Sequence, residues 1–162
     1  MFVVDTNILI YGADMDSPDH ARCRESLERW RSQTTPWYVT WGIVYEFLRV
    51  VTHSRVLNRP FSASHAWLFL DALFASPSLR ILVETDRHRH VAAEVFADVA
   101  DISGNLVFDA HTAILMRENG IKTIYTKDSD FNRFPFLDTV DPITDRRRTT
   151  ASRILPRSRG KS

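Results

Sequence analysis

The chain has 162 residues, of which 44% are hydrophobic and 25% are charged, and its formal net charge is +1. This length and composition indicate a globular protein of about one domain. No stretch approaches the roughly 18–20 apolar residues of a membrane span, and the N-terminus lacks the pattern of a signal peptide. The lone Cys23 cannot form an internal disulfide. These observations predict a cytoplasmic protein in a reducing compartment.

In chain order, strands alternate with helices. Short β-branched and aromatic runs predict strands, and longer apolar-periodic runs predict helices. The expected elements are a strand at 2–5, a helix at 16–33, a strand at 37–41, helices at 42–53 and 62–76, a strand at 80–84, helices at 86–101 and 106–119, a strand at 122–126, and a short fifth strand within 134–142. This alternation predicts an α/β domain with a mostly parallel central sheet of four to five strands flanked by helices.

The charges are distributed unevenly along the chain. All 20 acidic residues lie at or before Asp145, together with 14 of the 21 basic residues, which gives this part a net charge of −6. The other seven basic residues lie in 146–162, where no acidic residue occurs. We therefore expect one domain over residues 1–145 and a basic, disordered tail over 146–162. Such a tail either attracts nucleic acid or is a solvated end that offsets the acidic domain.

Four acidic residues stand where packing alone would favour an apolar residue. Asp5 closes the first strand, and Asp128 follows the fourth. Glu46 and Asp109 lie among apolar residues in two predicted helices. A charged group taken out of water must be paired, neutralised or bound to a metal. Each acid therefore needs a partner or a function.

Taken singly, each of the four acids has a structural explanation. Asp5 or Asp109 can cap a helix, Glu46 can pair with Arg49 one turn later, and Asp128 can form a side-chain turn. Taken together, they indicate a metal site, because sites in parallel sheets lie at the carboxyl ends of the strands.

Carboxylate oxygens suit Mg²⁺ or Mn²⁺, and such an ion can activate a water for attack on phosphorus. Three neighbouring polar side chains can orient the ligands: Thr6, Asn7 and Thr126.

Four local sequences resemble a known family. They are VVDTNILIYG at the start, Glu46 in the helix after the second strand, GNLVFDAHTAIL around Asp109, and IYTKDSDFNRF around Asp128. With EFLRVVTHSRVLNRP and AWLFLDALFASPSLRIL, they make residues 2–142 resemble a PIN-domain ribonuclease of the VapC type, the toxin of a type II toxin–antitoxin pair. This resemblance implies a three-layer PIN-like sandwich and an endoribonuclease that hydrolyses RNA phosphodiesters.

The resemblance also implies roles for particular residues and partners. Asp5, Glu46, Asp109 and Asp128 match the catalytic acids that bind Mg²⁺ or Mn²⁺ in the family, and Asp130 is the alternative to Asp128. The implied partners are RNA (tRNA, rRNA or mRNA), a cognate antitoxin and a second copy of the chain.

Two other functions stay open. A Mg²⁺-dependent phosphatase of the haloacid-dehalogenase type also begins with a strand that ends in Asp, but it requires a second Asp two residues later, where this chain has Asn7. A non-catalytic PIN-like module that binds RNA or protein would be favoured by the loss of one acid, and all four are present.

Overall fold

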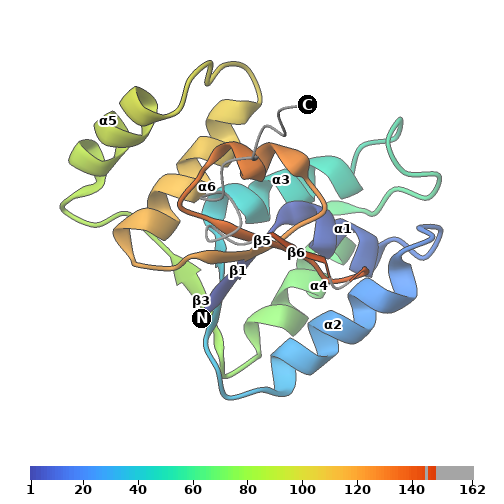
Figure 1. Cartoon of the computed structure of the whole chain (residues 1–162). Coiled ribbons are helices and arrows are strands. Elements are labelled where there is room, and N and C mark those ends of the chain that lie inside the picture. The colour runs from blue at the N-terminus through green and yellow to red at the C-terminus, as the bar shows by residue number, and fades with distance from the viewer. Residues whose placement is uncertain (145, 149–162) are drawn as a thin grey trace, which may run out of the picture.

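The computed structural model describes residues 1–144 and 146–148, and it contains one sheet with the strand order β3-β2-β1-β4-β5-β6 (Figure 1). The first five strands are parallel, and β6 pairs antiparallel with β5. This architecture confirms the predicted α/β fold with a parallel sheet, to which β6 adds an edge strand. The strands are β1 (Phe2–Val4), β2 (Trp37–Thr40), β3 (Leu79–Leu82), β4 (Thr123–Tyr125), β5 (Asp138–Asp141) and β6 (Arg146–Arg148).

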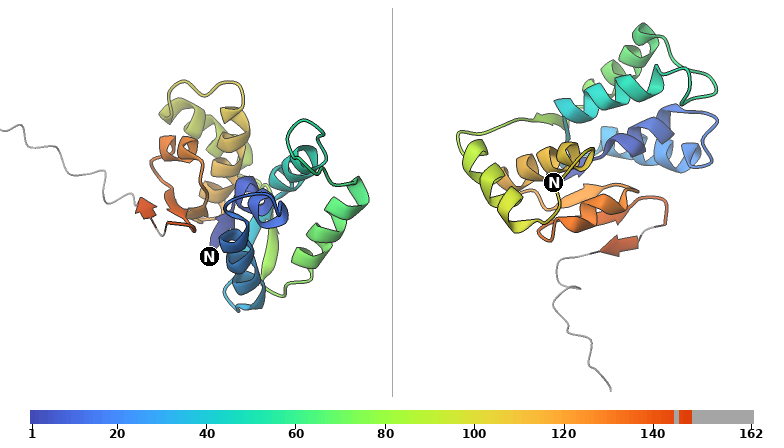
Figure 2. Two further views of the ribbon diagram at one scale, coloured as in Figure 1. Left: turned by 90° about the vertical axis from the view of Figure 1, so that its right-hand side faces the viewer. Right: turned by 90° about the horizontal axis from the view of Figure 1, so that it is seen from above.

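Within residues 1–144 and 146–148, six α-helices and one short 3₁₀ helix connect the strands and form two groups. They are α1 (Thr6–Ala13), α2 (His20–Ser32), α3 (Trp41–Val51), α4 (Ala63–Phe74), α5 (His88–Asp98), α6 (Leu106–Glu118) and η1 (Ser129–Arg133). Contacts join α1 to α2 and α3, and α3 to α4, whereas α6 contacts α5 and η1. Right-handed crossovers place these two groups on opposite faces of the sheet. Figures 1 and 2 show α5 and α6 well apart from α2 and α4.

The order of the strands creates a switch point beside β1. The chain leaves β1 for β2 and then β3, and it returns on the other side through β4 and β5. The ends of β1 and β4 are therefore neighbours, and Val4 pairs with Tyr125 in the register of the two strands. Ligand sites in open parallel sheets lie at such a switch point, outside the carboxyl ends of the strands.

Helix α1 is absent from the sequence prediction. It begins immediately after β1, with Asp5 as its N-terminal cap, and Ile8 and Leu9 within it are fully buried. Its eight residues are apolar on most sides, so they lack the polar face by which a surface helix is recognised. The next helix, predicted from residue 16, begins only at His20.

Part of the predicted tail belongs to the sheet. Residues Arg146–Arg148 form β6, so the expectation of disorder is wrong for these three residues. Residues 149–162, the rest of the predicted tail, lie outside the described residues.

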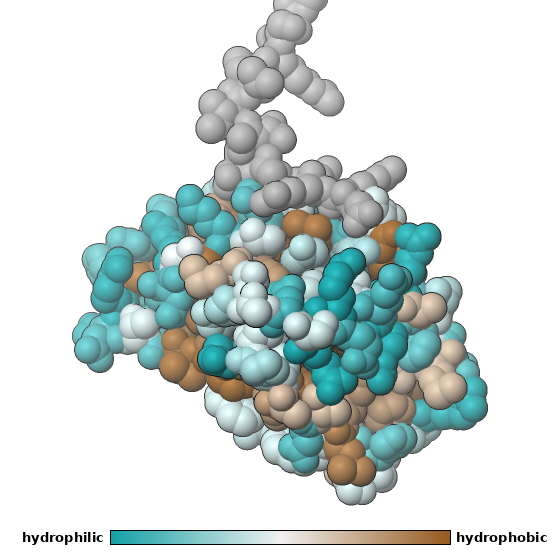
Figure 3. Space-filling model, turned by 90° about the horizontal axis from the view of Figure 1, so that it is seen from below, coloured by the Kyte–Doolittle hydropathy of each residue, from teal (hydrophilic) through white to brown (hydrophobic). Residues whose placement is uncertain are grey.

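The core lies on both faces of the central strands. Val3, Val4 and Ile124 from β1 and β4 are fully buried, and large side chains such as Phe47 and Met116 cover them from the helices. Cys23 is also buried, in agreement with a structural thiol. The surface carries hydrophobic patches among hydrophilic residues, as one face shows in Figure 3. Among the described residues, no helix is long and apolar enough to cross a membrane.

Candidate active site

Five acidic side chains gather at the carboxyl edge of the sheet, and they come from four separate parts of the chain. Asp5 follows β1, Glu46 lies in α3, and Asp109 lies in the first turn of α6. Asp128 caps η1 after β4, and Asp130 lies in the first turn of η1. Electrostatic repulsion couples Asp109 to all four of the others, which places them around one centre. The structure thus brings together the acids that the sequence singled out.

Asp5 is deeply buried, with 6% of its surface exposed. Its Oδ1 accepts a hydrogen bond of 2.7 Å from the Thr6 backbone N–H. Its Oδ2 accepts bonds of 2.6 Å from the Asn7 side-chain amide and 2.6 Å from the Thr126 hydroxyl. These bonds fix the carboxylate, but burial outweighs them and raises the pKa of Asp5 to about 7. Repulsion from Glu46 and Asp128 contributes to the rise.

Thr126 and Asn7 connect the ends of the two central strands. Besides donating to Asp5, the Thr126 hydroxyl accepts hydrogen bonds of 3.1 Å from the Asn7 amide and 2.8 Å from the Asp128 backbone N–H. The Asn7 Oδ1 accepts a bond of 3.2 Å from the Lys127 backbone N–H. The loop after β4 is therefore held directly to the residues that follow β1. The predicted supporting residues form one hydrogen-bonded network.

Glu46 reaches the site because α3 begins directly at the end of β2. The Thr40 hydroxyl caps the helix by accepting a hydrogen bond of 3.1 Å from the Ile43 N–H. The Thr6 hydroxyl donates a bond of 2.9 Å to Glu46 Oε2. Arg49 lies 3.5 Å from Glu46 Oε1, so the expected ion pair one turn later is also present. Thr6 therefore links Glu46 to the cap of α1, where Asp5 lies.

Asp109 forms a compact group with Asp128 and Asp130. One carboxylate oxygen each of Asp109, Asp128 and Asp130 lies within 4.8 Å of the others. Burial and then repulsion, first from Asp5 and then from Asp128, raise the pKa of Asp109 to about 7. The sequence offers Asp130 as an alternative to Asp128, whereas the structure places both carboxylates beside Asp109. Five oxygen-donor side chains in such a cluster can hold a divalent cation.

Lys127 is a neighbour of the site that sequence analysis missed. Its ammonium group forms an ion pair with Asp19, which lies at the N-terminal end of α2, and it lies 5.6 Å from the centroid of the Tyr11 ring. The lysine thus fastens the loop that carries Asp128 and Asp130 to the first two helices. No local pattern links residue 127 with residue 19, because the contact depends on how α2 packs.

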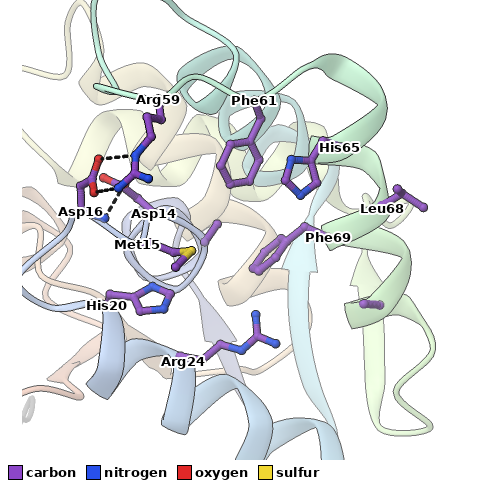
Figure 4. A pocket seen from close by; sticks show the side chains of 12 residues that line it. Asp14, Met15, Asp16, His20, Arg24, Arg59, Phe61, His65, Leu68 and Phe69 are labelled. Atoms are coloured by element: carbon purple, nitrogen blue, oxygen red, sulfur yellow. Dashed lines mark hydrogen bonds and ion pairs between the residues drawn. The ribbon is translucent and has the colours of Figure 1, made fainter.

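A separate hollow of about 530 Å³ lies between the loop before α2, the loop before α4, and α4 itself (Figure 4). Phe61, Leu68 and Phe69 contribute apolar surface. Arg59 from one loop forms an ion pair with Asp16 from the other, which joins the two sides of the hollow. No pattern in the sequence predicts this hollow, because it depends on the packing of two loops far apart in the chain.

Comparison with protein families and known sequences identifies relatives over most of the chain. A model of the PIN domain matches residues 2–137. The VapC ribonuclease Mb2897 of Mycobacterium bovis is 37% identical over 143 residues, which cover 88% of this chain and 96% of the relative. Ribonuclease VapC48 of Mycobacterium tuberculosis is 32% identical over 140 residues, 86% of this chain and 96% of the relative.

Solved structures share the fold at lower sequence identity. The structure of VapBC2 from Rickettsia felis, bound to a DNA fragment from its promoter, matches with a TM-score of 0.62 and 19% identity, over 85% of this chain and 96% of that one. Mycobacterium tuberculosis VapC20, a toxin that cleaves the sarcin–ricin loop, matches with a TM-score of 0.58 and 19% identity, over 82% and 93%. The chain therefore belongs to the PIN-domain family, and within it to the VapC ribonucleases.

Proposed function

We propose that the protein is a divalent-metal-dependent endoribonuclease, the toxin of a toxin–antitoxin pair, and that it hydrolyses RNA phosphodiesters. The observation that carries this proposal is the cluster of five carboxylates at the switch point of the sheet. Two of them, Asp5 and Asp109, have a pKa of about 7 without a cation. Such crowding is unfavourable unless a positive charge lies among the carboxylates.

The side chains of the cluster fit Mg²⁺ or Mn²⁺. All donors are hard oxygen atoms, and among the described residues the cluster includes no His or Cys with which zinc would pair. The residues that would hold the ion are Asp5, Glu46, Asp109, Asp128 and Asp130. When bound, such an ion polarises a phosphoryl oxygen and lowers the pKa of a coordinated water.

Polar side chains of the protein orient the carboxylates that take part in the reaction. Thr6, Asn7 and Thr126 hold the carboxylates of Asp5 and Glu46 at fixed angles through the hydrogen bonds described above. A site carboxylate oxygen accepts the proton of the attacking water as the water oxygen bonds to phosphorus. The bond from phosphorus to a ribose oxygen breaks, and that oxygen takes up a proton from a solvent water and leaves as the hydroxyl group of one strand end.

An RNA-cleavage assay tests the proposal. Protein freed of any antitoxin is incubated with structured and single-stranded RNA in Mg²⁺, in Mn²⁺ or in EDTA. We expect cleavage with either metal, none in EDTA, and none by Asp5→Asn. Asp71→Asn, which neutralises an exposed acid on α4, is the matched control and should cleave as the wild type does. RNA binding without cleavage in either metal would instead support the non-catalytic module.

Membership of the PIN-domain family leaves the haloacid-dehalogenase alternative without support. Asn7, which stands where that class requires a second Asp, donates to Asp5 and to Thr126. Its role is thus the orientation of neighbouring groups. Hydrolysis of a small phosphomonoester at rates comparable to RNA cleavage would contradict this view.

The partners of the protein follow from the same proposal. We propose that a cognate antitoxin binds it in the cytoplasm, where its RNA substrate occurs, and the hollow of Figure 4 is a candidate surface for an apolar segment of that antitoxin. Co-expression with the cognate antitoxin tests this proposal, because Leu68→Asp should weaken the complex and leave free-toxin activity unchanged.

We also propose a homodimer. It would form through the edge strand β3 and α5, since Val83, directly after β3, and Phe96 of α5 are 51% and 47% exposed. The molar mass in solution tests it, since Phe96→Asp should produce monomers.

A further inference from the structure

Two strongly exposed aromatic rings directly precede two acids of the candidate site. Tyr45, which precedes Glu46, is 64% exposed, and Phe108, which precedes Asp109, is 71% exposed. The two residues lie on α3 and α6, on opposite sides of the sheet. Packing of the core explains neither ring, because a ring that contributed to the core would be covered. Their shared position beside a site acid requires another explanation.

The exposed face of α3 connects the aromatic residues to the site. Trp41 and Tyr45 lie one helical turn apart, with ring centroids 6.0 Å from each other and planes inclined by 33°. Glu46 and Arg49 follow on the same exposed side, whereas Ile43, Val44 and Phe47 on the opposite side are buried. One open helix face thus carries two rings, a site carboxylate and a cation.

The charge of the domain indicates what these rings contact. Residues 1–148, which include the three arginines of β6, carry a net charge of −3, which opposes binding of the phosphates of RNA. RNA held at the site therefore gains from contacts that do not depend on charge, and stacking of bases on aromatic rings is the strongest such contact for unpaired nucleotides.

Resting on the function proposed above, we propose that Tyr45 and Phe108 stack on the unpaired bases on either side of the cleaved phosphodiester. Trp41 extends the stack along α3, and Arg49, with 68% of its side chain exposed, contacts a neighbouring phosphate. The substrate that fits is a single-stranded segment or loop, since bases in a duplex have no free face for a ring. Recognition at this site thus depends on whether the bases are paired.

Binding of RNA without cleavage tests the proposal. In the Asp5→Asn background, the affinity for a labelled single-stranded oligonucleotide is measured by fluorescence anisotropy. Tyr45→Ala and Phe108→Ala should each lower it roughly tenfold, within the range of about 5- to 150-fold that alanine substitution of a stacked ring produces. Tyr45→Phe, which keeps the ring, should bind as the parent does. Trp67→Ala removes an exposed ring on α4 and is the matched control.

An oligonucleotide without bases beside the cleavage site identifies the contact. Loss of the base should weaken binding to the parent roughly tenfold and leave binding to Tyr45→Ala or Phe108→Ala nearly unchanged, because ring and base act as a pair. Equal losses in parent and variant would overturn the proposal. So would variants that keep their RNA affinity but lose the homodimer or the antitoxin, since the rings would then contact protein.

Different experimental results would refute the proposed ribonuclease function and the proposed stacking role. If wild-type protein cleaves no RNA in either metal, the ribonuclease function itself is refuted. If wild-type protein cleaves RNA and both alanine variants bind and cleave as it does, only the stacking role is refuted. Circular dichroism of each variant checks that these exposed substitutions leave the fold intact.

Discussion

Replacing Asp5 by Asn should remove most of the pH dependence that the active site imposes on stability in the absence of metal. The carboxyl group of Asp5 has a pKa of 3.8 when it is unperturbed and about 7 in the folded protein. Below pH 4 it is protonated in both states and contributes no pH dependence. Between pH 4 and pH 7 only the unfolded chain releases the proton, so the free energy of unfolding falls as the pH rises. Above pH 7 both states are ionised and the full penalty applies.

The size of the effect follows from the shift of the pKa. Three units at about 1.4 kcal/mol each give a total penalty of about 4 kcal/mol, of which about 3 kcal/mol develops between pH 5 and pH 8. Asp109, whose pKa is also about 7, adds a dependence of the same sign but smaller size, because it is only half-buried, and repulsion from Asp5 is the second cause of its raised pKa. Asp5→Asn therefore removes its own contribution and part of that of Asp109. The wild type should lose at least about 3 kcal/mol more than the variant over this pH interval.

Urea titration in EDTA at pH 5 and at pH 8 measures this difference. Asp71→Asn, on the exposed side of α4, should show the same pH dependence as the wild type. Millimolar Mg²⁺ should restore stability to the wild type at pH 8, because an ion that binds only the folded state stabilises it. If the wild type and Asp5→Asn lose equal stability between pH 5 and pH 8, burial of Asp5 does not control the electrostatics of the site.

Three other perturbations test separate parts of the site. Thr126→Val removes the hydroxyl that contacts Asp5, Asn7 and the Asp128 backbone, so we expect a 10- to 100-fold loss of cleavage with the fold retained in circular dichroism. Asp128→Asn and Asp130→Asn should each raise the Mg²⁺ concentration needed for half-maximal cleavage, and an unchanged requirement in either would remove that acid from the metal site. Deletion of residues 149–162, which contain four basic residues, should weaken RNA binding most at low salt; an unchanged salt dependence would show that the tail is a solvated end.

The sequence was sufficient to single out four of the five clustered acids, because each of the four stands out against its local pattern. Asp5 follows three apolar residues of a strand, and Asp109 follows Phe108 at the start of a helix with an apolar interior. The alternation of strands and helices then predicts that strand ends meet at one edge of a sheet. Helix α1 was missed because only its N-cap, Asp5, separates it from β1, so no connecting segment marks where it begins. Its apolar sequence also has no polar face.

Other features depend on geometry that no short-range pattern encodes. Two acids two residues apart can point to opposite sides of a loop, but here Asp128 caps η1 by accepting a bond of 2.8 Å from the Asp130 N–H, and both face Asp109. The ion pair of Lys127 with Asp19 and the hollow beside α4 join segments that are distant in the sequence. These arrangements arise from how the helices pack.

The acidic charge of the domain affects which kinds of RNA it can bind. A site with five carboxylates repels RNA until a cation neutralises part of its charge, so metal binding and substrate binding favour each other. Affinity supplied by stacking on Tyr45 and Phe108 requires unpaired bases, whereas affinity supplied by basic residues would extend to any RNA. If the rings stack on bases as proposed, the domain should discriminate against duplex RNA, because a duplex offers its exposed rings no free base to contact.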